Sequence, residues 1–291
     1  MDLDGAYIEP LLDEWLKDLQ TVIKQEEDLV KANDEFYMPF VALPISVVSV
    51  IFKLSDYLNL DSHTRYIAIH LYDKFMCKYF WQVYKVDITN HTDSSWTQVC
   101  KKISGQSKLY LVCCLQLASK MDSHSKKLGI SQVLSTLQSI DNKTKYNRSI
   151  IFSSELTILK MMDFKIPICT SLNCVEVLLA ATGLRNTPNM ENLSVTLLDL
   201  IYLQREKLYS HLQCLAQGHI AKTDQEKRSL MTLESNSLFL AAAVVLCGTF
   251  FTNINAQTAK VIASKLSNLV DIEADNIWDM ANILLVLAIQ E

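Results

Sequence analysis

Residues 109–121 (LYLVCCLQLASKM) constrain the fold of this chain more than any other segment. Leu111, Leu115 and Ala118 mark one face of a helix, and the residues between them are also mostly small or apolar. A helix that is apolar on nearly every side is surrounded by other helices, and small residues let those neighbours approach closely. Residues 235–251 (SNSLFLAAAVVLCGTFF) repeat this composition. Each segment therefore predicts the central helix of a helical bundle.

The scarcity of turn-forming residues also favours an all-helical fold. The 291 residues include six Gly and five Pro, and sheets need such residues at their turns. Hydrophobic residues make up 49% of the chain and charged residues 20%, which is too apolar a composition for general disorder. At roughly 150 residues per domain, the length predicts two domains or one large domain.

Hydrophobic periodicity predicts an N-terminal helix followed by two sets of five helices. Residues 1–37 are acidic, and apolar residues recur there at helical spacing. We expect this amphipathic helix to pack on the domain that it precedes, the alternative being a partner-binding helix that stands alone. Ile166-Pro167 marks a boundary because proline disfavours helix in the residue before it. The expected divisions are 1–38, 39–166 and 167–291.

The predicted helices of the two sets have similar lengths. In the first set they span 44–58, 61–84, 109–121, 130–139 and 147–162, with a polar loop at 86–104 that carries a short helix near 96–102. In the second set they span 171–182, 189–209, 234–251, 255–266 and 273–289, with a charged loop at 224–228. In each set, the third helix is the apolar one.

The residues offer no catalytic or metal-binding pattern. No GxSxG, P-loop, HExxH or GxGxxG motif occurs, so we expect no enzymatic activity and no cofactor. The eight Cys show no CxxC or CxxH spacing, so we expect no metal. The acidic N-terminus does not resemble a signal peptide.

Charge and apolar run length argue against two further classes of partner, although they leave room for a local basic patch. The formal net charge is −5, whereas nucleic-acid-binding surfaces are basic, so we expect no direct nucleic-acid contact. The longest apolar run, 238–247, is shorter than the about 20 residues that a membrane helix needs. We therefore expect a protein-binding protein with no membrane contact.

Three segments resemble, in order, parts of the cyclin box. The end of 109–121 (LASK) is similar to the close of the third cyclin-box helix, and 63–76 (HTRYIAIHLYDKFM) resembles the second helix with its Asp-basic-Phe ending. Residues 154–166 (SELTILKMMDFKI) resemble the fifth helix. The resemblance covers about 40–166, and the second set fits a cyclin C-terminal fold by pattern only. It implies two tandem five-helix cyclin-like folds behind an N-terminal helix.

The resemblance carries over a candidate partner-binding site. In cyclins, a third-helix Lys and a fifth-helix Glu form the polar centre of the contact with a cyclin-dependent kinase, and they match Lys120 and Glu155 here. Met121 stands where many cyclins have an aromatic residue, and its adaptable side chain can serve the same contact. The remaining apolar members match Leu159, Phe164 and Ile166. The alternative is two unrelated surface charges, whose pairing contributes about 0–1 kcal/mol.

Two departures from cyclins bear on partner choice. The first-helix pattern that docks substrates falls on residues 43–50, where Pro44 replaces its Arg and Val50 its Trp. The Asp position of a structural Arg–Asp pair is Ser49. Docking of basic substrate motifs is therefore not expected. The 86–104 connection is longer than usual and is a candidate for partner specificity.

The resemblance further points to a divergent branch of cyclin-like proteins associated with meiotic crossover formation. It implies meiotic recombination proteins as further partners and a nuclear location, with the cytoplasm left open. One alternative is a pure scaffold that keeps the fold and binds crossover factors without a kinase. Another is a nucleic-acid-associated factor of the general transcription type, which the acidic N-terminus and negative net charge disfavour.

Overall fold

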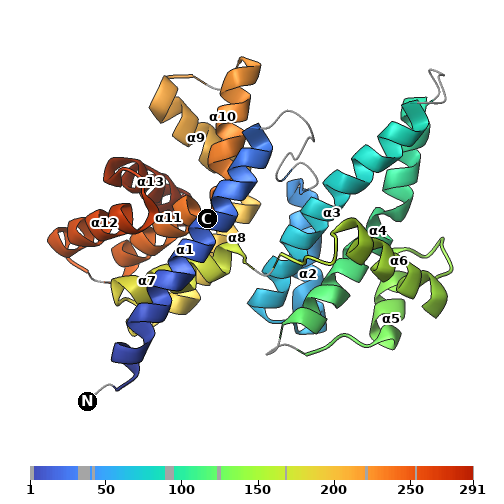
Figure 1. Cartoon of the computed structure of the whole chain (residues 1–291), viewed down its shortest axis with the longest axis horizontal. Coiled ribbons are helices and arrows are strands. Elements are labelled where there is room, and N and C mark those ends of the chain that lie inside the picture. Colours follow the sequence, from blue (N-terminus) through green and yellow to red (C-terminus); the bar gives the residue numbers. More distant parts are fainter. Residues whose placement is uncertain are drawn as a thin grey trace. The chain divides into compact units, whose positions relative to one another are not determined.

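The computed structural model describes residues 3–31, 40, 43–88, 95–122, 126–167, 169–219, 222–252 and 254–290. This described part holds thirteen helices and no strand (Figure 1), which confirms the all-helical prediction. The chain forms two compact units. One comprises Phe36–Ile168, and the other comprises Met1–Glu35 together with Cys169–Glu291. We call them the α2–α6 unit and the α7–α13 unit.

Helix α4 is the centre of the α2–α6 unit and contacts α2, α3, α5 and α6. Every residue from Leu109 to Ser119 is buried, as a helix enclosed on all sides requires. The helices are α2 (Ile45–Leu58), α3 (Ser62–Ile88), α4 (Ser95–Met121), α5 (Ile130–Ile140) and α6 (Arg148–Met161).

The connection expected at 86–104 does contain the short helix predicted near 96–102, but this helix is the first part of α4 and no loop separates it from residue 109. Helix α3 continues to Ile88 and α4 already begins at Ser95, while 89–94 lie outside the described residues. Val99 is buried and Ile103 is half-buried, whereas the polar residues around them face outward. A helix in a two-helix hairpin buries only a narrow stripe of residues. The other positions are exposed and polar, so the sequence of these helical turns resembles that of a loop.

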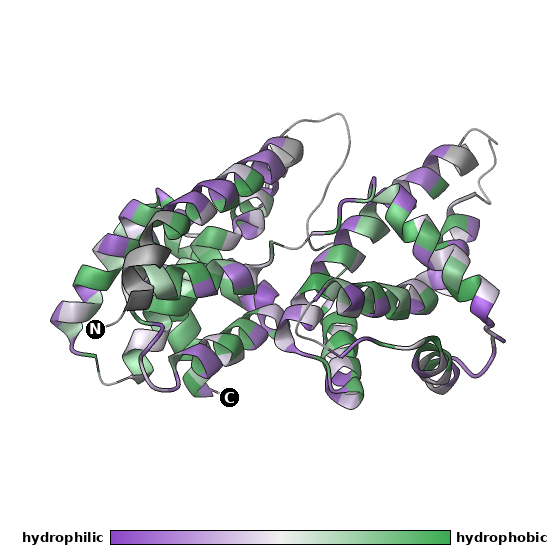
Figure 2. Cartoon of the chain, turned by 60° about the horizontal axis from the view of Figure 1, so that its bottom comes forward, coloured by the Kyte–Doolittle hydropathy of each residue, from purple (hydrophilic) through white to green (hydrophobic). Residues whose placement is uncertain are grey.

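Helix α11 is the centre of the α7–α13 unit and contacts α7, α8, α12 and α13. All residues from Leu238 to Thr249 are buried. Figure 2 shows hydrophobic residues gathered where the helices of each unit face one another. The helices are α7 (Ser171–Thr182), α8 (Met190–Leu203), α9 (Arg205–Gln217), α10 (Asp224–Ser235), α11 (Ser237–Phe251), α12 (Ala256–Val270) and α13 (Ala274–Gln290).

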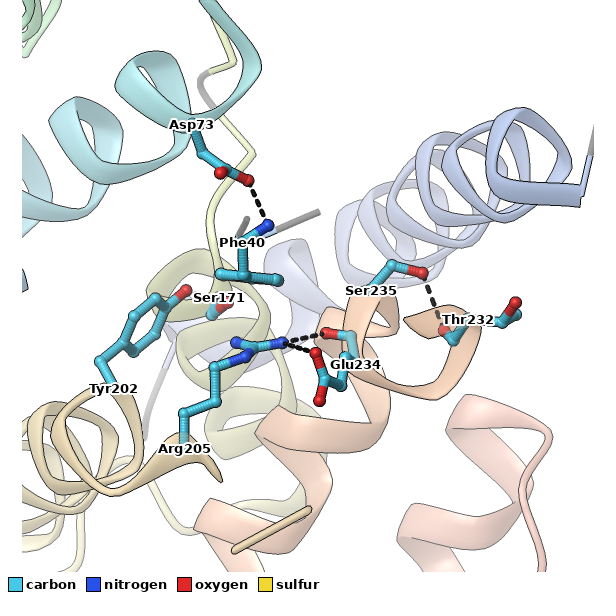
Figure 3. Close-up of polar contacts among 8 residues, drawn as sticks. All are labelled: Phe40, Asp73, Ser171, Tyr202, Arg205, Thr232, Glu234 and Ser235. Atoms are coloured by element: carbon cyan, nitrogen blue, oxygen red, sulfur yellow. Dashed lines mark hydrogen bonds and ion pairs between the residues drawn. The ribbon is translucent and has the colours of Figure 1, made fainter. Parts of the chain in front are cut away.

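This unit has two helices beyond the five expected. The single helix predicted at 189–209 is divided at Gln204, and α10 lies where a charged loop was predicted. Helix α10 begins with a capping box, in which Thr223 Oγ1 accepts from the Glu226 N–H at 3.2 Å and Glu226 Oε2 accepts from the Thr223 N–H at 3.0 Å. The buried Arg205 donates to the carbonyl and carboxylate of Glu234 at 3.0 and 3.4 Å, joining α9 to α10 (Figure 3).

The N-terminal helix α1 (Leu3–Lys31) belongs to the α7–α13 unit and not, as expected, to the unit that it precedes. It contacts α7, α10 and α11, burying Leu12, Leu16, Leu19 and Ile23. The side-chain amide of Gln20 donates to the Leu269 carbonyl at 2.9 Å. The amphipathic stripe correctly indicated which face is buried, but such a stripe does not specify the surface that covers it.

Among the described residues, no single helix is both long and apolar enough to cross a membrane. Gln225–Ser235 and Ser237–Phe251 together meet that criterion of length and composition, but they are bent by 63° relative to each other.

Candidate partner-binding site

The structure brings Lys120 and Glu155 together, although 35 positions separate them in sequence. Lys120 lies in the last turn of α4, and its Nζ donates to Glu155 Oε1 at 2.5 Å in the middle of α6. The Lys120 side chain is 39% exposed and that of Glu155 is 9% exposed. The pair therefore lies at the edge of the core, with its cation facing outward.

The buried side of this pair lies close to the thiol of Cys113. Burial and the carboxylate of Glu155 raise the pKa of the Cys113 thiol to about 12, while the nearby Lys120 acts in the opposite direction. A thiol with so high a pKa stays protonated and is a poor nucleophile. Cys113 therefore packs as a small apolar residue beneath the ion pair.

Local hydrogen bonds fix the C-terminal end of α4. Ser119 Oγ donates to the Gln116 carbonyl at 2.7 Å and accepts from the Leu128 N–H at 3.0 Å. Thr64 Oγ1, on α3, donates to Asp122 Oδ2 at 2.8 Å. These groups are buried, so a donor or acceptor that lost its partner could not form a hydrogen bond with water instead. The network therefore fixes the position of the helix end that carries Lys120.

Helix α6 buries two polar side chains and exposes two large apolar ones. Asn147 begins it by accepting from the Ile150 N–H at 2.9 Å. Its buried stripe includes Ser154 and Glu155, whereas Phe152 and Leu156 are 52% and 46% exposed. Burying a carboxylate while exposing two large apolar side chains is unfavourable for an isolated unit, and such exposed patches mark binding surfaces.

Phe152 and Leu156 were not among the residues predicted for the site. They share one face of α6 with Leu159, at positions i, i+4 and i+7, directly beside Glu155. The sequence signal that points to them is the number and spacing of apolar residues along α6. α6 has more apolar positions than one stripe can bury, so a second apolar face remains.

The other predicted apolar residues surround this face. Leu159 and Ile166 are half-buried, while Met121 is 49% exposed and follows Lys120 directly. Phe164 is 66% exposed and has a left-handed backbone, with φ 58°. A bulky residue rarely adopts a positive φ, and such strain clusters at functional sites.

The backbone at Phe164 is held by four contacts at the end of α6. The Phe164 N–H donates to the Leu159 carbonyl at 2.8 Å, and the Lys165 N–H donates to the Met162 carbonyl at 2.8 Å. Lys78 Nζ, from α3, donates to the Met161 carbonyl at 3.2 Å and pairs with Asp163 at 3.3 Å. The aromatic ring is thus presented to solvent by an ordered turn.

The stretch that aligns with the cyclin docking pattern begins α2. Pro44 is its N-cap and is exposed, and Val50 is 41% exposed. Nearby, the buried Asp73 accepts a hydrogen bond from the Phe40 N–H at 2.6 Å (Figure 3). A backbone amide thus donates to this carboxylate.

Taken as chemistry, this surface suits recognition of another protein. A charged pair lies at its centre, and an apolar rim surrounds it; we call the whole the α4–α6 face. Its members are Lys120, Met121, Phe152, Glu155, Leu156, Leu159, Phe164 and Ile166. A central polar contact that becomes desolvated by an apolar rim is the usual anatomy of an energetically strong interface.

Comparison with known proteins agrees with this fold. No family model matches the chain. It is 26% identical over 216 residues to cyclin N-terminal domain-containing protein 1 of Mus musculus, covering 71% of this chain and 64% of the relative. For the Homo sapiens protein of the same name the identity is 25%, over 71% of this chain and 65% of the relative. The chain thus spans somewhat less than two-thirds of these relatives, and the all-helical fold and the relatives together support a cyclin-like resemblance.

Proposed function

We propose that this protein is a non-enzymatic, cyclin-like regulatory protein that binds a cyclin-dependent kinase through the α4–α6 face. The observation that carries the proposal is the buried Glu155 joined to Lys120, beside the exposed Phe152 and Leu156. Exposure of the two apolar side chains has a cost in the separate chain, and covering by a partner removes that cost. A kinase bound here would be biased toward whichever of its conformations makes the better contact.

The strained turn at Phe164 supports the same assignment. The ring is 66% exposed and its residue adopts a left-handed backbone, so burial against the described residues does not compensate for this conformation. A partner that buries the ring would gain the apolar area of an aromatic side chain without ordering it first.

A kinase-independent scaffold is the second candidate. The observation that favours it is that Lys120 and Glu155 already satisfy each other within the chain, which leaves the pair fewer groups to offer a partner. In that case the apolar rim would bind another protein, such as a recombination factor, and the charged pair would act in folding alone.

Co-purification with a panel of cyclin-dependent kinases tests the proposal. We expect the wild type to recover at least one kinase, and Lys120→Glu and Glu155→Ala to lose it, because removing one partner of a desolvated pair costs about 2–5 kcal/mol. Lys143→Glu, an exposed lysine of the same unit, is the matched control. Undiminished recovery by both variants, folded by circular dichroism, would exclude the interface; no recovery at all would favour the scaffold.

The proposal extends to a nuclear role in meiotic recombination, in contact with recombination proteins. Its support is the resemblance of the chain, especially of residues 109–184, to a divergent branch of cyclin-like proteins associated with that process. Immunofluorescence of a tagged chain on spread meiotic chromosomes tests it. Foci that coincide with crossover sites are expected, and a signal confined to the cytoplasm would refute this part of the proposal.

A further inference from the structure

The C-terminal turns of α3 and the N-terminal turns of α4 form a hairpin that extends beyond the other helices of the α2–α6 unit (Figure 1). Along its inner side Val83 and Val99 are buried. Closer to the bundle, the Tyr79 hydroxyl donates to Gln106 Oε1, and the Tyr79 ring contacts that of Tyr110 with centroids 5.1 Å apart. The hairpin therefore has a core of its own.

Four aromatic residues gather on one flank of this hairpin, and we call them the aromatic cluster. Phe80 lies 5.2 Å from Trp81 and 5.7 Å from Tyr84, measured between ring centroids on α3. Trp96, from α4, lies 6.1 Å from Phe80 and 6.2 Å from Tyr84. The first three rings are half-buried, but Trp96 is 56% exposed. The cluster thus leaves a large aromatic surface in solvent at the end of the hairpin.

Lysines flank the aromatic cluster. Lys78, Trp81 and Lys85 lie at positions i, i+3 and i+7 of α3, which places them along one side of the helix. On α4, Lys101 and Lys102 are exposed. Lys85, Lys101 and Lys102 form no ion pair with any residue in the described part of the chain. Their charges are thus directed at solvent.

The local sequence is basic in an acidic chain. Between Asp73 and Asp122 there are seven lysines, two aspartates, and no arginine or glutamate, giving a formal charge of +5. The whole chain carries −5. An exposed tryptophan among unopposed lysines is complementary to an acidic surface that offers an apolar group.

We propose that the aromatic cluster and its flanking lysines bind an acidic peptide segment of a partner protein, with an apolar side chain of that segment against Trp96. The exposed end of this site lies far from the centre of the α4–α6 face, because Trp96 and Lys120 are at opposite ends of α4, about 36 Å apart at 1.5 Å per residue. Only Lys78, at the other end of the site, reaches the turn that carries Phe164. A peptide bound on Trp96 therefore leaves the Lys120–Glu155 pair uncovered, and one chain can hold both partners.

The ring geometry favours a peptide over single-stranded nucleic acid. Trp96 meets Phe80 and Tyr84 at interplanar angles of 81° and 89°. Stacked bases need successive open ring faces along a continuous basic groove, whereas Trp96 meets its neighbours edge to face and Phe80 and Tyr84 are already stacked on each other at an interplanar angle of 12°. Leucine and phenylalanine side chains fit between such edges without stacking.

Fluorescence anisotropy on the full chain tests the proposal. The probe is a fluorescein-labelled peptide of about fifteen residues that combines Asp and Glu with Leu and Phe at helical spacing. We expect saturable binding that Trp96→Ala weakens about 30-fold, the loss typical of a central tryptophan anchor. The double variant Lys85→Glu/Lys101→Glu is expected to weaken binding about tenfold and to reduce its salt dependence.

Matched controls separate binding from folding. Tyr57→Ala removes an aromatic side chain that is 77% exposed on α2, and Lys143→Glu reverses a lysine on another surface of the chain; both should bind the peptide as the wild type does. The lysine reversals touch no buried group, so they test the proposal even if Trp96→Ala perturbs the hairpin. Equal binding of a peptide with Lys in place of each acid would overturn the proposal. The proposal would also be overturned if oligothymidylate bound more tightly than the acidic peptide, or if the peptide showed no saturable binding. It would fail as well if folded Trp96→Ala and Lys85→Glu/Lys101→Glu bound the peptide as tightly as the wild type.

Discussion

Replacing Lys120 with Met should destabilise α6 because it leaves the carboxylate of Glu155 buried without its cation. An exposed pair contributes about 0–1 kcal/mol, and breaking a fully buried pair costs about 3–5 kcal/mol. Here one side chain is 39% exposed and the other 9%. The expected cost in free energy of unfolding is therefore intermediate, about 2 kcal/mol.

Substitution of Glu155, alone and together with Lys120, completes a double-mutant cycle. Glu155→Leu leaves Lys120, which can turn toward water, so its cost should be about 1 kcal/mol. The double variant Lys120→Met/Glu155→Leu replaces the pair with apolar side chains and should lie within about 1 kcal/mol of the wild type. The coupling energy between the two sites is then about 2 kcal/mol.

Native-state hydrogen exchange is the suitable assay because the chain has two units, and a single global transition would mix their stabilities. Amides of α4 and α6 should exchange faster in Lys120→Met by about 30-fold. Lys143→Met, which removes an exposed lysine of the same unit, should change nothing. A coupling energy near zero, with Lys120→Met as stable as the wild type, would refute the reasoning.

Three further substitutions or reactions test other parts of the structure. Phe164→Gly should stabilise α6 by about 1 kcal/mol in the same exchange assay, because Gly adopts φ 58° without strain; kinase recovery should nevertheless fall, and lower stability would contradict the strain. Cys113, whose pKa is raised to about 12 by burial and Glu155, should resist iodoacetamide at pH about 8, where the exposed Cys100 reacts; peptide mass spectrometry that finds equal labelling would exclude this. Arg205→Met removes a buried guanidinium that binds Glu234 twice, and should destabilise α9 and α10 by about 2–3 kcal/mol while α4 exchange stays unchanged; no change at α10 would show the contact to be dispensable.

The sequence was most informative where apolarity is unambiguous. Residues 109–121 and 235–251 predict enclosed helices, and the structure buries every residue over 109–119 in α4 and over 238–249 in α11. The prediction missed α10, and it gave the first turns of α4 as a separate short helix within a loop, because the exposed faces of both are as polar as a loop. Helix α1 failed in another way, because its stripe of leucines is compatible with either unit.

Part of the candidate site could be predicted, and the rest depends on three-dimensional packing. Lys120 and Glu155 came from the resemblance, and the structure places them in contact. Phe152 and Leu156 could not be separated from core residues until the burial of Glu155 fixed the phase of α6. The positive φ of Phe164 has no sequence signature, because side-chain identity argues against it.

The central proposal is that the α4–α6 face contacts a cyclin-dependent kinase, and Leu156→Glu tests it most directly. Leu156 is 46% exposed, so the substitution adds a charge to the face without altering the core; Val261→Glu, at a 61% exposed position on α12, is the matched control. The measurement is the Kd of the purified kinase for each variant. We expect Leu156→Glu to raise the Kd at least about 30-fold, since the new carboxylate would be buried unpaired, and Val261→Glu to leave it unchanged. Equal Kd values for Leu156→Glu and the wild type would contradict the account.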